Sequence, residues 1–192
     1  MPKQISENEL KNIVVDDTHE LADSCNKNHC VTKNTKLIIV GTITPPAGAG
    51  YFYTAPRNKI YGYIDECGFG TTLKPLKKQL HENKQTAPET VEEIKKQLVS
   101  NNIAFLDVIK CAVRKKDSPA DGDISHYVLD VDSFKIASDA VIICNSRLAE
   151  QCYIEICEKL NKQPNHIFLS QRSGRKVEWL NAIKNAINKN QA

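Results

Sequence analysis

The sequence predicts an α/β protein in which a three-layer α/β/α sandwich surrounds a four-stranded parallel sheet. Four short apolar runs have the length and composition of buried strands, and they lie at residues 36–41, 103–108, 140–144 and 166–169. Segments with helical periodicity separate these runs, and strands joined by helices of ten or more residues pair in parallel through right-handed crossovers. The chain has 192 residues, enough for one substantial core, so we expect a single domain over residues 1–192.

The N-terminal part is expected to begin with a helix that packs on this domain. Ser6 and Glu9 form an S-x-x-E capping box, and apolar residues follow at helical spacing, which predicts a helix over 6–24. After the first strand, the pattern indicates helices near 60–64 and 73–83. A second capping box, Thr86 with Glu89, begins a helix that leads to the second strand.

The C-terminal part alternates in the same way after one irregular stretch. Residues 110–127 show little regular pattern and are expected to form a long polar loop, of a length that is usually functional or disordered. A short helix is expected near 131–137 and an amphipathic helix at 147–160, and a last helix carries apolar residues from Val177 to Ile187 on one side.

Composition argues against several classes of protein. The first ten residues lack the apolar run of a signal peptide, and the longest apolar stretches are too short to cross a bilayer. Seven scattered cysteines fit reduced thiols in a cytosol better than a disulfide framework. Cys25, His29 and Cys30 lack the second pair that would complete a tetrahedral metal site. We therefore expect a cytoplasmic monomer with no membrane partner, no metal and no cofactor.

The most specific stretch is residues 36–64, KLIIVGTITPPAGAGYFYTAPRNKIYGYI. It reads as a buried strand that breaks at Gly41 into a turn rich in small residues, prolines and aromatics. Open α/β sheets bind their ligands at the carboxyl ends of their strands. We therefore expect this loop to form part of a binding site.

Two features of this loop have both a structural and a functional interpretation. The aromatic run of Tyr51, Phe52 and Tyr53 can stack a base that has left the helix, or it can pack the loop onto its own domain. The amide of Asn58 can orient a water or read a base edge, or it can cap the helix that follows. No phosphate-binding P-loop, dinucleotide fingerprint, zinc-protease motif or nucleophile-histidine pair is present.

Basic residues accumulate in the loops that follow the four strands. Because the carboxyl ends of parallel strands meet at one edge, we expect a positive rim there, suited to a phosphate backbone. Its members are Arg57, Lys59, Lys110, Arg114, Lys115, Lys116, Arg147, Arg172, Arg175 and Lys176. In the alternative interpretation Asp117, Asp121 and Asp123 neutralise part of the rim and the charges are merely solvated.

The first loop resembles the first motif of the uracil-DNA glycosylase superfamily, especially the branch with hypoxanthine-DNA glycosylases and mismatch-specific enzymes. In that branch a strand ends in a turn from glycine to proline, followed by an aromatic pair, a Pro-x-Asn and another aromatic. The matching residues of this chain are Gly41, Thr42, Pro45, Phe52, Tyr53, Pro56, Arg57, Asn58 and Tyr61.

Two further stretches extend the resemblance over residues 36–185. Residues 102–124 are similar to the branch's stretch with an Asp-Val pair, an Arg and a Ser-x-x-Asp. The matching residues are Asp107, Val108, Arg114, Ser118 and Asp121. Residues 169–176, LSQRSGRK, occupy the place of the DNA-intercalating motif.

The resemblance implies a monofunctional DNA glycosylase that hydrolyses the N-glycosidic bond of a damaged base such as uracil or hypoxanthine, on a flipped nucleotide in DNA. It implies that Asn58 positions water or base, with Thr44 beside it and Asp107 as a carboxylate at a strand end. It also implies two binding sets. The base would lie among Gly41, Thr42, Pro45, Tyr51, Phe52 and Tyr53. DNA would contact Arg57, Arg114, Lys115, Gln171, Arg172, Ser173 and Arg175.

The chain also departs from the family pattern. Thr44 stands where the superfamily often has Asp or Asn, and the last motif lacks the usual His and Ser-Pro pair. An amide such as Asn58 can orient water but cannot take its proton. Two other functions therefore stay open: a catalytically inactive nucleic-acid or nucleotide binding protein on the same fold, and an α/β enzyme or regulator that binds a small anionic ligand.

Overall fold

The structure is a computed structural model that describes residues 2–44, 49–82, 87–118, 120–135, 139–170 and 174–188. Its centre is a parallel four-stranded sheet, sheet B. In spatial order the strands are β4 (Ile103–Asp107), β3 (Leu37–Gly41), β7 (Val141–Cys144) and β8 (His166–Phe168). All three strand pairings are parallel, which confirms the predicted sheet, and each strand boundary agrees with the sequence prediction within one residue.

The two central strands were recognisable because they are buried on both faces. All five residues of β3 and all five of β4 are buried, so the sequence reads as a continuous apolar run and not as an alternating pattern. Asp107 is the exception, a buried carboxylate at the end of β4.

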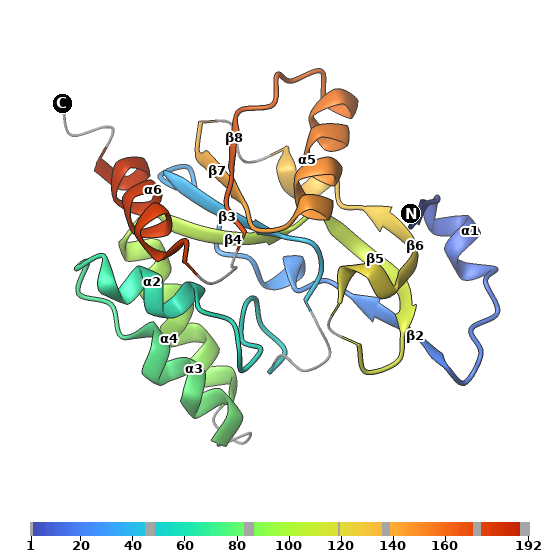
Figure 1. Cartoon of the computed structure of the whole chain (residues 1–192), viewed down its shortest axis with the longest axis horizontal. Coiled ribbons are helices and arrows are strands. Elements are labelled where there is room, and N and C mark those ends of the chain that lie inside the picture. Colours follow the sequence, from blue (N-terminus) through green and yellow to red (C-terminus); the bar gives the residue numbers. More distant parts are fainter. Residues whose placement is uncertain are drawn as a thin grey trace.

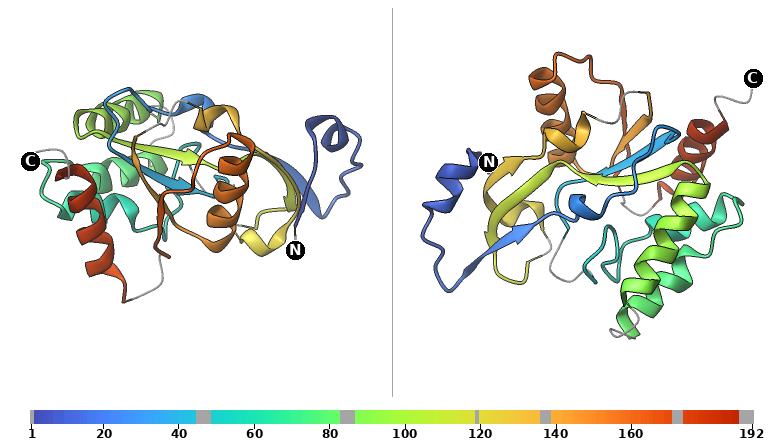
Figure 2. Two further views of the ribbon diagram at one scale, coloured as in Figure 1. Left: turned by 90° about the horizontal axis from the view of Figure 1, so that it is seen from above. Right: turned by 180° about the vertical axis from the view of Figure 1, so that it is seen from behind.

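Helices cover both faces of sheet B, as the sandwich architecture requires. They are α2 (Ile60–Glu66), α3 (Leu73–Glu82), α4 (Ala87–Ser100), α5 (Arg147–Lys159) and α6 (Lys176–Asn188). Figures 1 and 2 show α2, α3, α4 and α6 on one side of the sheet and α5 on the other. The ring of Trp179 on α6 stacks on that of Tyr63 on α2, with centroids 6.0 Å apart. The chain therefore has the predicted α/β/α layers.

The segment at 110–127 is not the predicted loop, because it forms most of a second sheet, sheet A. In spatial order its strands are β1 (Lys3–Gln4), β6 (Ile124–Leu129), β5 (Ile109–Lys115) and β2 (His19–Asp23). Strand β5 pairs antiparallel with both β6 and β2, and only Val108 separates it from β4. Two register shifts in the β5–β6 pair and a buried Arg114 break the alternation that would have indicated a strand.

The prediction of an N-terminal helix over 6–24 was also wrong, because the helix is much shorter. The Ser6–Glu9 capping box is present, but the helix it begins, α1, spans only Glu7–Lys11. A turn follows in which Asp16 accepts a hydrogen bond from the backbone N–H of Thr18 at 2.9 Å, and the chain then enters β2. Short polar side chains that bond to nearby backbone favour such turns over helix.

Short 3-10 turns complete the described fold. They are η1 (Asn26–Asn28), η3 (Asp121–Asp123) and η4 (Asp132–Phe134). The last of these lies in the predicted helix near 131–137, of which residues 136–138 are outside the described part. Among the helices that the structure describes, none is both long enough and apolar enough to span a bilayer.

Candidate functional site

A cavity of about 360 Å³ opens at the carboxyl edge of sheet B. Three adjacent strands contribute to its wall: Thr42 and Thr44 follow β3, Asp107 ends β4, and Asn145 and Ser146 follow β7. The remaining polar lining comes from Tyr53 and Asn58 of the first loop and from Asp121 of η3. The structure thus brings together the three residues expected to be catalytic, Asn58, Thr44 and Asp107, around one space.

Asp107 is the buried carboxylate of this cavity, with 3% of its surface exposed. Its Oδ2 accepts two hydrogen bonds from Thr44, from the backbone N–H at 2.9 Å and from the hydroxyl at 2.8 Å. Burial raises the pKa of Asp107 to about 7, although the hydrogen bonds from Thr44 oppose the shift, and the nearby charge of Asp121 adds to it. The carboxyl group therefore changes its protonation near neutral pH.

Gly41 makes the close approach of two polar groups possible. A Cβ atom placed on Gly41 would lie 2.8 Å from Oδ1 of Asp107 and 3.0 Å from the hydroxyl oxygen of Tyr53. Both atoms thus lie over the same point of the backbone, where no other residue type would leave room. Glycine is therefore required here for space.

A chain of hydroxyl groups links the loops after β3 and β7 to η3. Thr42 donates to Oδ2 of Asp121 at 2.8 Å, and its oxygen lies 2.8 Å from the hydroxyl oxygen of Ser146. Ser146 also accepts the backbone N–H of Ala149, so that it caps the N-terminus of α5. Since the hydroxyl of Thr42 donates its proton to Asp121, the hydroxyl of Ser146 can donate its proton to the oxygen of Thr42.

Asn145, Ser146 and Asp121 are lining residues that the sequence analysis did not assign to the site. The first two stand at a strand-to-helix turn, where an apolar run ends in an Asn-Ser pair. This Asn-Ser pair at the end of a strand could have indicated that the two residues belong to the site. Asp121 was noted in the Ser-x-x-Asp stretch, but the only role expected for it was to neutralise neighbouring Lys and Arg side chains.

For Asn58, the structural and the functional interpretation both fit. Its Oδ1 accepts the backbone N–H of Ile60 at 2.9 Å, at the start of α2, while the residue also lines the cavity. The buried Lys77 of α3 fixes the same loop by donating to the backbone carbonyls of Asn58 and Pro56, at 2.6 and 3.2 Å. These bonds fix the position of Asn58, and the bond to Ile60 uses its amide oxygen and not its NH₂ group.

All three residues of the aromatic run belong to the core, and one of them also lines the cavity. Tyr51 and Phe52, expected to stack a base, are fully buried in the hydrophobic core and do not line the cavity. The carbonyl of Phe52 accepts the hydroxyl of Tyr61 at 2.8 Å, which fixes the loop over the core. Only Tyr53 reaches the cavity, and its ring packs edge-on against Phe105 with centroids 4.9 Å apart.

The expected positive rim is incomplete. Arg114 lies in β5 and is 1% exposed, so it is not the surface DNA contact that was expected, because its strand faces the interior at that position. Lys115 is exposed at the end of the same strand, and Arg57 is exposed beside Asn58. Pro45, Gln171, Arg172 and Ser173 lie outside the described residues.

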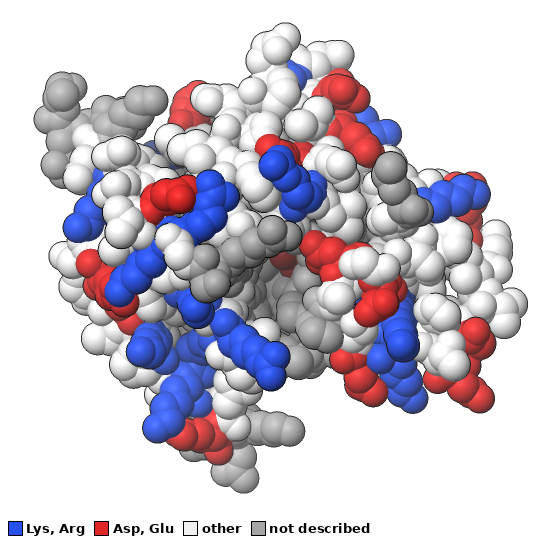
Figure 3. Space-filling view, viewed as in Figure 1, with Lys and Arg blue, Asp and Glu red and all other residues white. Residues whose placement is uncertain are grey.

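Several of the other basic residues are paired with acids. The pairs are Lys110 with Glu7, Arg147 with Glu150, Arg175 with Glu178 and Lys176 with Glu66. Figure 3 shows that Lys and Arg gather on the side of α2 and α3, whereas acidic side chains border the central hollow on the side of β5. On this face the basic side chains are therefore most concentrated on the side of α2 and α3.

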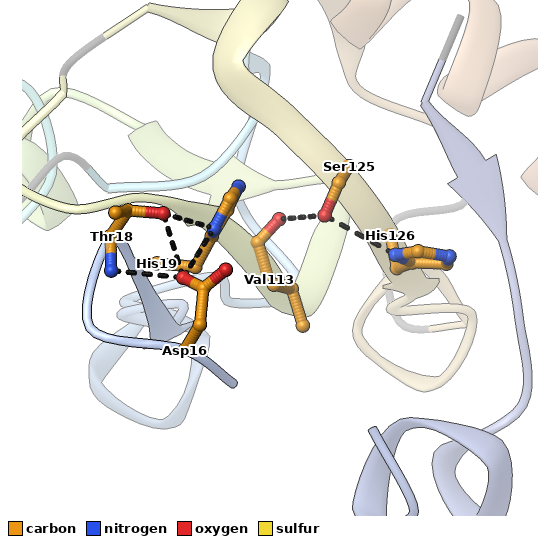
Figure 4. Close-up of polar contacts among 6 residues, drawn as sticks. All are labelled: Asp16, Thr18, His19, Val113, Ser125 and His126. Carbon is orange, nitrogen blue, oxygen red and sulfur yellow. Dashed lines mark hydrogen bonds and ion pairs between the residues drawn. The ribbon is translucent and has the colours of Figure 1, made fainter. Parts of the chain in front are cut away.

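Two groups of hydroxyl and imidazole side chains lie on sheet A, outside the cavity (Figure 4). In one, Thr18 and His19 surround Asp16, and their hydrogen bonds hold the pKa of that carboxyl well below its usual range. In the other, Ser125 donates to the carbonyl of Val113 at 3.3 Å and lies 3.2 Å from Nδ1 of His126. Neither group contains a hydroxyl, an imidazole and a carboxylate arranged as a catalytic triad.

Comparison with known proteins finds a similarity in structure but none in sequence. No family model matches the sequence. No curated protein sequence matches it either. Among solved structures, the chain is similar to the solution NMR structure of a candidate uracil DNA glycosylase from Methanosarcina acetivorans. The two share 15% sequence identity and a TM-score of 0.52, over 82% of this chain and 94% of that chain. The chain therefore has a uracil-DNA-glycosylase-like α/β fold.

Proposed function

We propose that the chain is a monofunctional DNA glycosylase that hydrolyses the N-glycosidic bond of a deaminated base such as uracil or hypoxanthine. One observation carries the proposal: a buried carboxyl group with a pKa of about 7 faces a cavity at the carboxyl edge of the parallel sheet. This is where open α/β sheets bind ligands. The likeness in fold to a candidate uracil DNA glycosylase supports it.

In the proposed reaction Asp107 accepts the proton of the attacking water. Thr44 holds Oδ2 of Asp107, so Oδ1 is the oxygen directed to the reacting water. The water oxygen forms a bond with C1′ of the sugar, the bond from C1′ to the base nitrogen breaks, and its electron pair leaves with the base. A general base works best when its pKa lies near the working pH, as that of Asp107 does.

This assignment accounts for the threonine at position 44. A carboxylate is needed near the sugar, because the transition state carries positive charge there. Asp107 supplies it from β4, while the two donors of Thr44 fix its orientation. Thr44 is therefore a positioning residue in the proposed site and not the base itself.

Asn58 and Arg57 have separate roles in the proposal. The cap of α2 fixes the amide of Asn58 by its oxygen, so its NH₂ group is the donor for water or base. Arg57 is the adjacent exposed cation and would contact the phosphate backbone beside the flipped nucleotide.

A second candidate function is nucleic-acid or nucleotide binding without catalysis. The observation that favours it is that several polar groups of the cavity already have structural partners. Thr44 donates twice to Asp107, Asn58 accepts the first backbone N–H of α2, and Ser146 caps α5. In this alternative Asp107 serves only to hold the loop after β3.

Strand scission distinguishes the two functions. Purified protein is incubated with single- and double-stranded oligonucleotides that carry one uracil, hypoxanthine or xanthine, and alkali then cleaves any abasic site. The glycosylase predicts scission at one or more of these bases, with a loss of at least 100-fold in Asp107→Asn and none in the exposed control Asp17→Asn. Binding of the oligonucleotides without scission of any of them would favour the second function.

A further inference from the structure

Tyr53 has a backbone conformation that tyrosine rarely adopts. Its φ is 56°, in the left-handed region, whereas the neighbouring Tyr51 and Phe52 have ordinary conformations and enter the core. A bulky residue in this region is strained, and such strain is concentrated at functional sites. The ring of Tyr53 still packs on the core residue Phe105, but unlike Tyr51 and Phe52 the residue also lines the cavity.

The hydroxyl of Tyr53 is buried and has no hydrogen-bond partner among the described residues. The side chain is 7% exposed, so bulk water cannot replace the missing partner. A buried hydroxyl without a partner is unfavourable, because it has lost its hydrogen bonds to water and gained none in return. Both the strain and the unpaired donor are thus unfavourable for folding alone, which suggests a partner that binds in the cavity.

The surroundings of this hydroxyl make it a hydrogen-bond donor. Burial, and then the nearby charge of Asp107, raise the pKa of Tyr53 well above 10, so the group keeps its proton at every physiological pH. Its oxygen and Oδ1 of Asp107 both lie over the Cα atom of Gly41. The two atoms therefore present a donor and a carboxyl oxygen to the same part of the cavity.

The geometry points to Tyr53 as the residue that selects the base, by donating its hydroxyl to a carbonyl oxygen of a nucleobase bound in the cavity. Uracil, hypoxanthine and xanthine carry a carbonyl oxygen where cytosine, adenine and guanine carry an amino group. An amino group cannot accept the hydroxyl proton and would leave it unpaired. The inference rests on the proposed function in one respect, that the ligand is a nucleobase.

The expected discrimination follows from this unpaired donor. A site built to hydrogen-bond one group rejects an analogue without it far more strongly than an apolar pocket does, because a buried polar group is left without a partner. Removing the hydroxyl should therefore weaken the binding of carbonyl-bearing bases and leave that of amino bases almost unchanged.

The test compares Tyr53→Phe with Tyr51→Phe, which removes a buried hydroxyl of the same loop that does not line the cavity. Ligand-observed NMR titrations measure the affinity of each protein for uracil, cytosine, hypoxanthine and adenine as free bases. We expect the unchanged protein and Tyr51→Phe to prefer uracil over cytosine, or hypoxanthine over adenine, by at least tenfold. Tyr53→Phe should reduce that preference to less than threefold.

Thermal unfolding gives a second readout. Since the hydroxyl has no partner within the part of the chain that the structure describes, Tyr53→Phe should unfold at the same temperature as the unchanged protein or higher. An unfolding temperature several degrees lower would mean that the hydroxyl is bonded within the protein, and it would overturn the inference. So would a preference that survives in Tyr53→Phe, or a lack of base binding in the unchanged protein.

The strand-scission assay keeps this inference separate from the proposed function. Base preference that depends on Tyr53, without scission of any oligonucleotide, would uphold the inference and contradict the glycosylase. Scission in the unchanged protein, with a base preference that does not depend on Tyr53, would uphold the glycosylase and contradict the inference.

Discussion

The side chain of Asn26 forms hydrogen bonds with both backbone polar groups of Asp107. Its Oδ1 accepts the N–H of Asp107 at 2.8 Å, and its Nδ2 donates to the carbonyl of Asp107 at 2.7 Å and to Oδ2 of Asp130 at 2.6 Å. Because β4 is the edge strand of sheet B, Asn26 takes the place of a neighbouring strand at this position. The carboxyl group of the cavity is thus positioned through its backbone by a residue 81 positions earlier in the chain.

Replacing Asn26 with alanine should destabilise the protein. The change leaves the buried N–H and carbonyl of Asp107 without partners, and each such loss costs about 1–3 kcal/mol. We expect urea denaturation to show an unfolding free energy lower by about 2–4 kcal/mol. The exposed Asn34→Ala serves as control, and equal stability of both variants would show that the pair of bonds contributes nothing.

Gly41→Ala should disrupt the cavity. The new Cβ would lie 2.8 Å from Oδ1 of Asp107, so that Asp107 and Tyr53 must both move. Overpacking of this kind costs about 1–3 kcal/mol, and ligand binding should fall with it. Gly122→Ala is a matched control, because a Cβ there meets nothing within 4 Å. A Gly41→Ala protein with unchanged denaturation midpoint and base affinity would contradict the described geometry.

The stability of the protein should depend on Asp107 between about pH 4 and pH 7. Its pKa is raised from 3.8 to about 7, so in this window the folded state binds more protons than the unfolded state. The contribution of this group to stability is therefore present at low pH and lost as pH rises through 7. The loss is on the order of 4 kcal/mol if the unfolded value is unperturbed.

The measurement is the difference in unfolding free energy between the unchanged protein and Asp107→Asn from pH 4 to pH 8. As pH rises, the unfolding free energy of the unchanged protein should fall relative to that of Asp107→Asn, since asparagine does not ionise. Glycosylase activity should rise over the same pH range, because the proposed base acts in its ionised form. A stability difference that is constant over this range would show that the pKa of Asp107 is not raised.

Arg57 should contribute to DNA binding through its charge. Each phosphate contact adds about 0.9 to the slope of the logarithm of affinity against the logarithm of salt concentration on duplex DNA. Arg57→Gln should lower that slope by about one unit in fluorescence-anisotropy titrations. Lys110→Gln, whose charge is already paired with Glu7 of α1, should leave the slope unchanged. Equal slopes for Arg57→Gln and the unchanged protein would place the DNA elsewhere.

The parallel sheet and its helices were predictable because their signals are local. The strands at Leu37–Gly41 and Ile103–Asp107 are buried on both faces and read as continuous apolar runs. The capping box at Ser6 marked the true start of a helix, although not its end. Sheet A was missed because β5 carries a buried arginine and two register shifts, and these remove the period of two by which a strand is recognised.

The sequence by itself predicted that the loops after β3 and β4 meet at one sheet edge, and its resemblance to a known family assigned Asp107, Thr44 and Asn58 to one site there. Only the tertiary structure decided which of three consecutive aromatics enters the cavity, that Arg114 lies in the interior, and that Asn26 holds Asp107 in place. The reason is physical. The positions of the strands along the chain follow from local apolar runs. The burial and the partners of a side chain depend on segments that are distant in sequence and become neighbours only on folding.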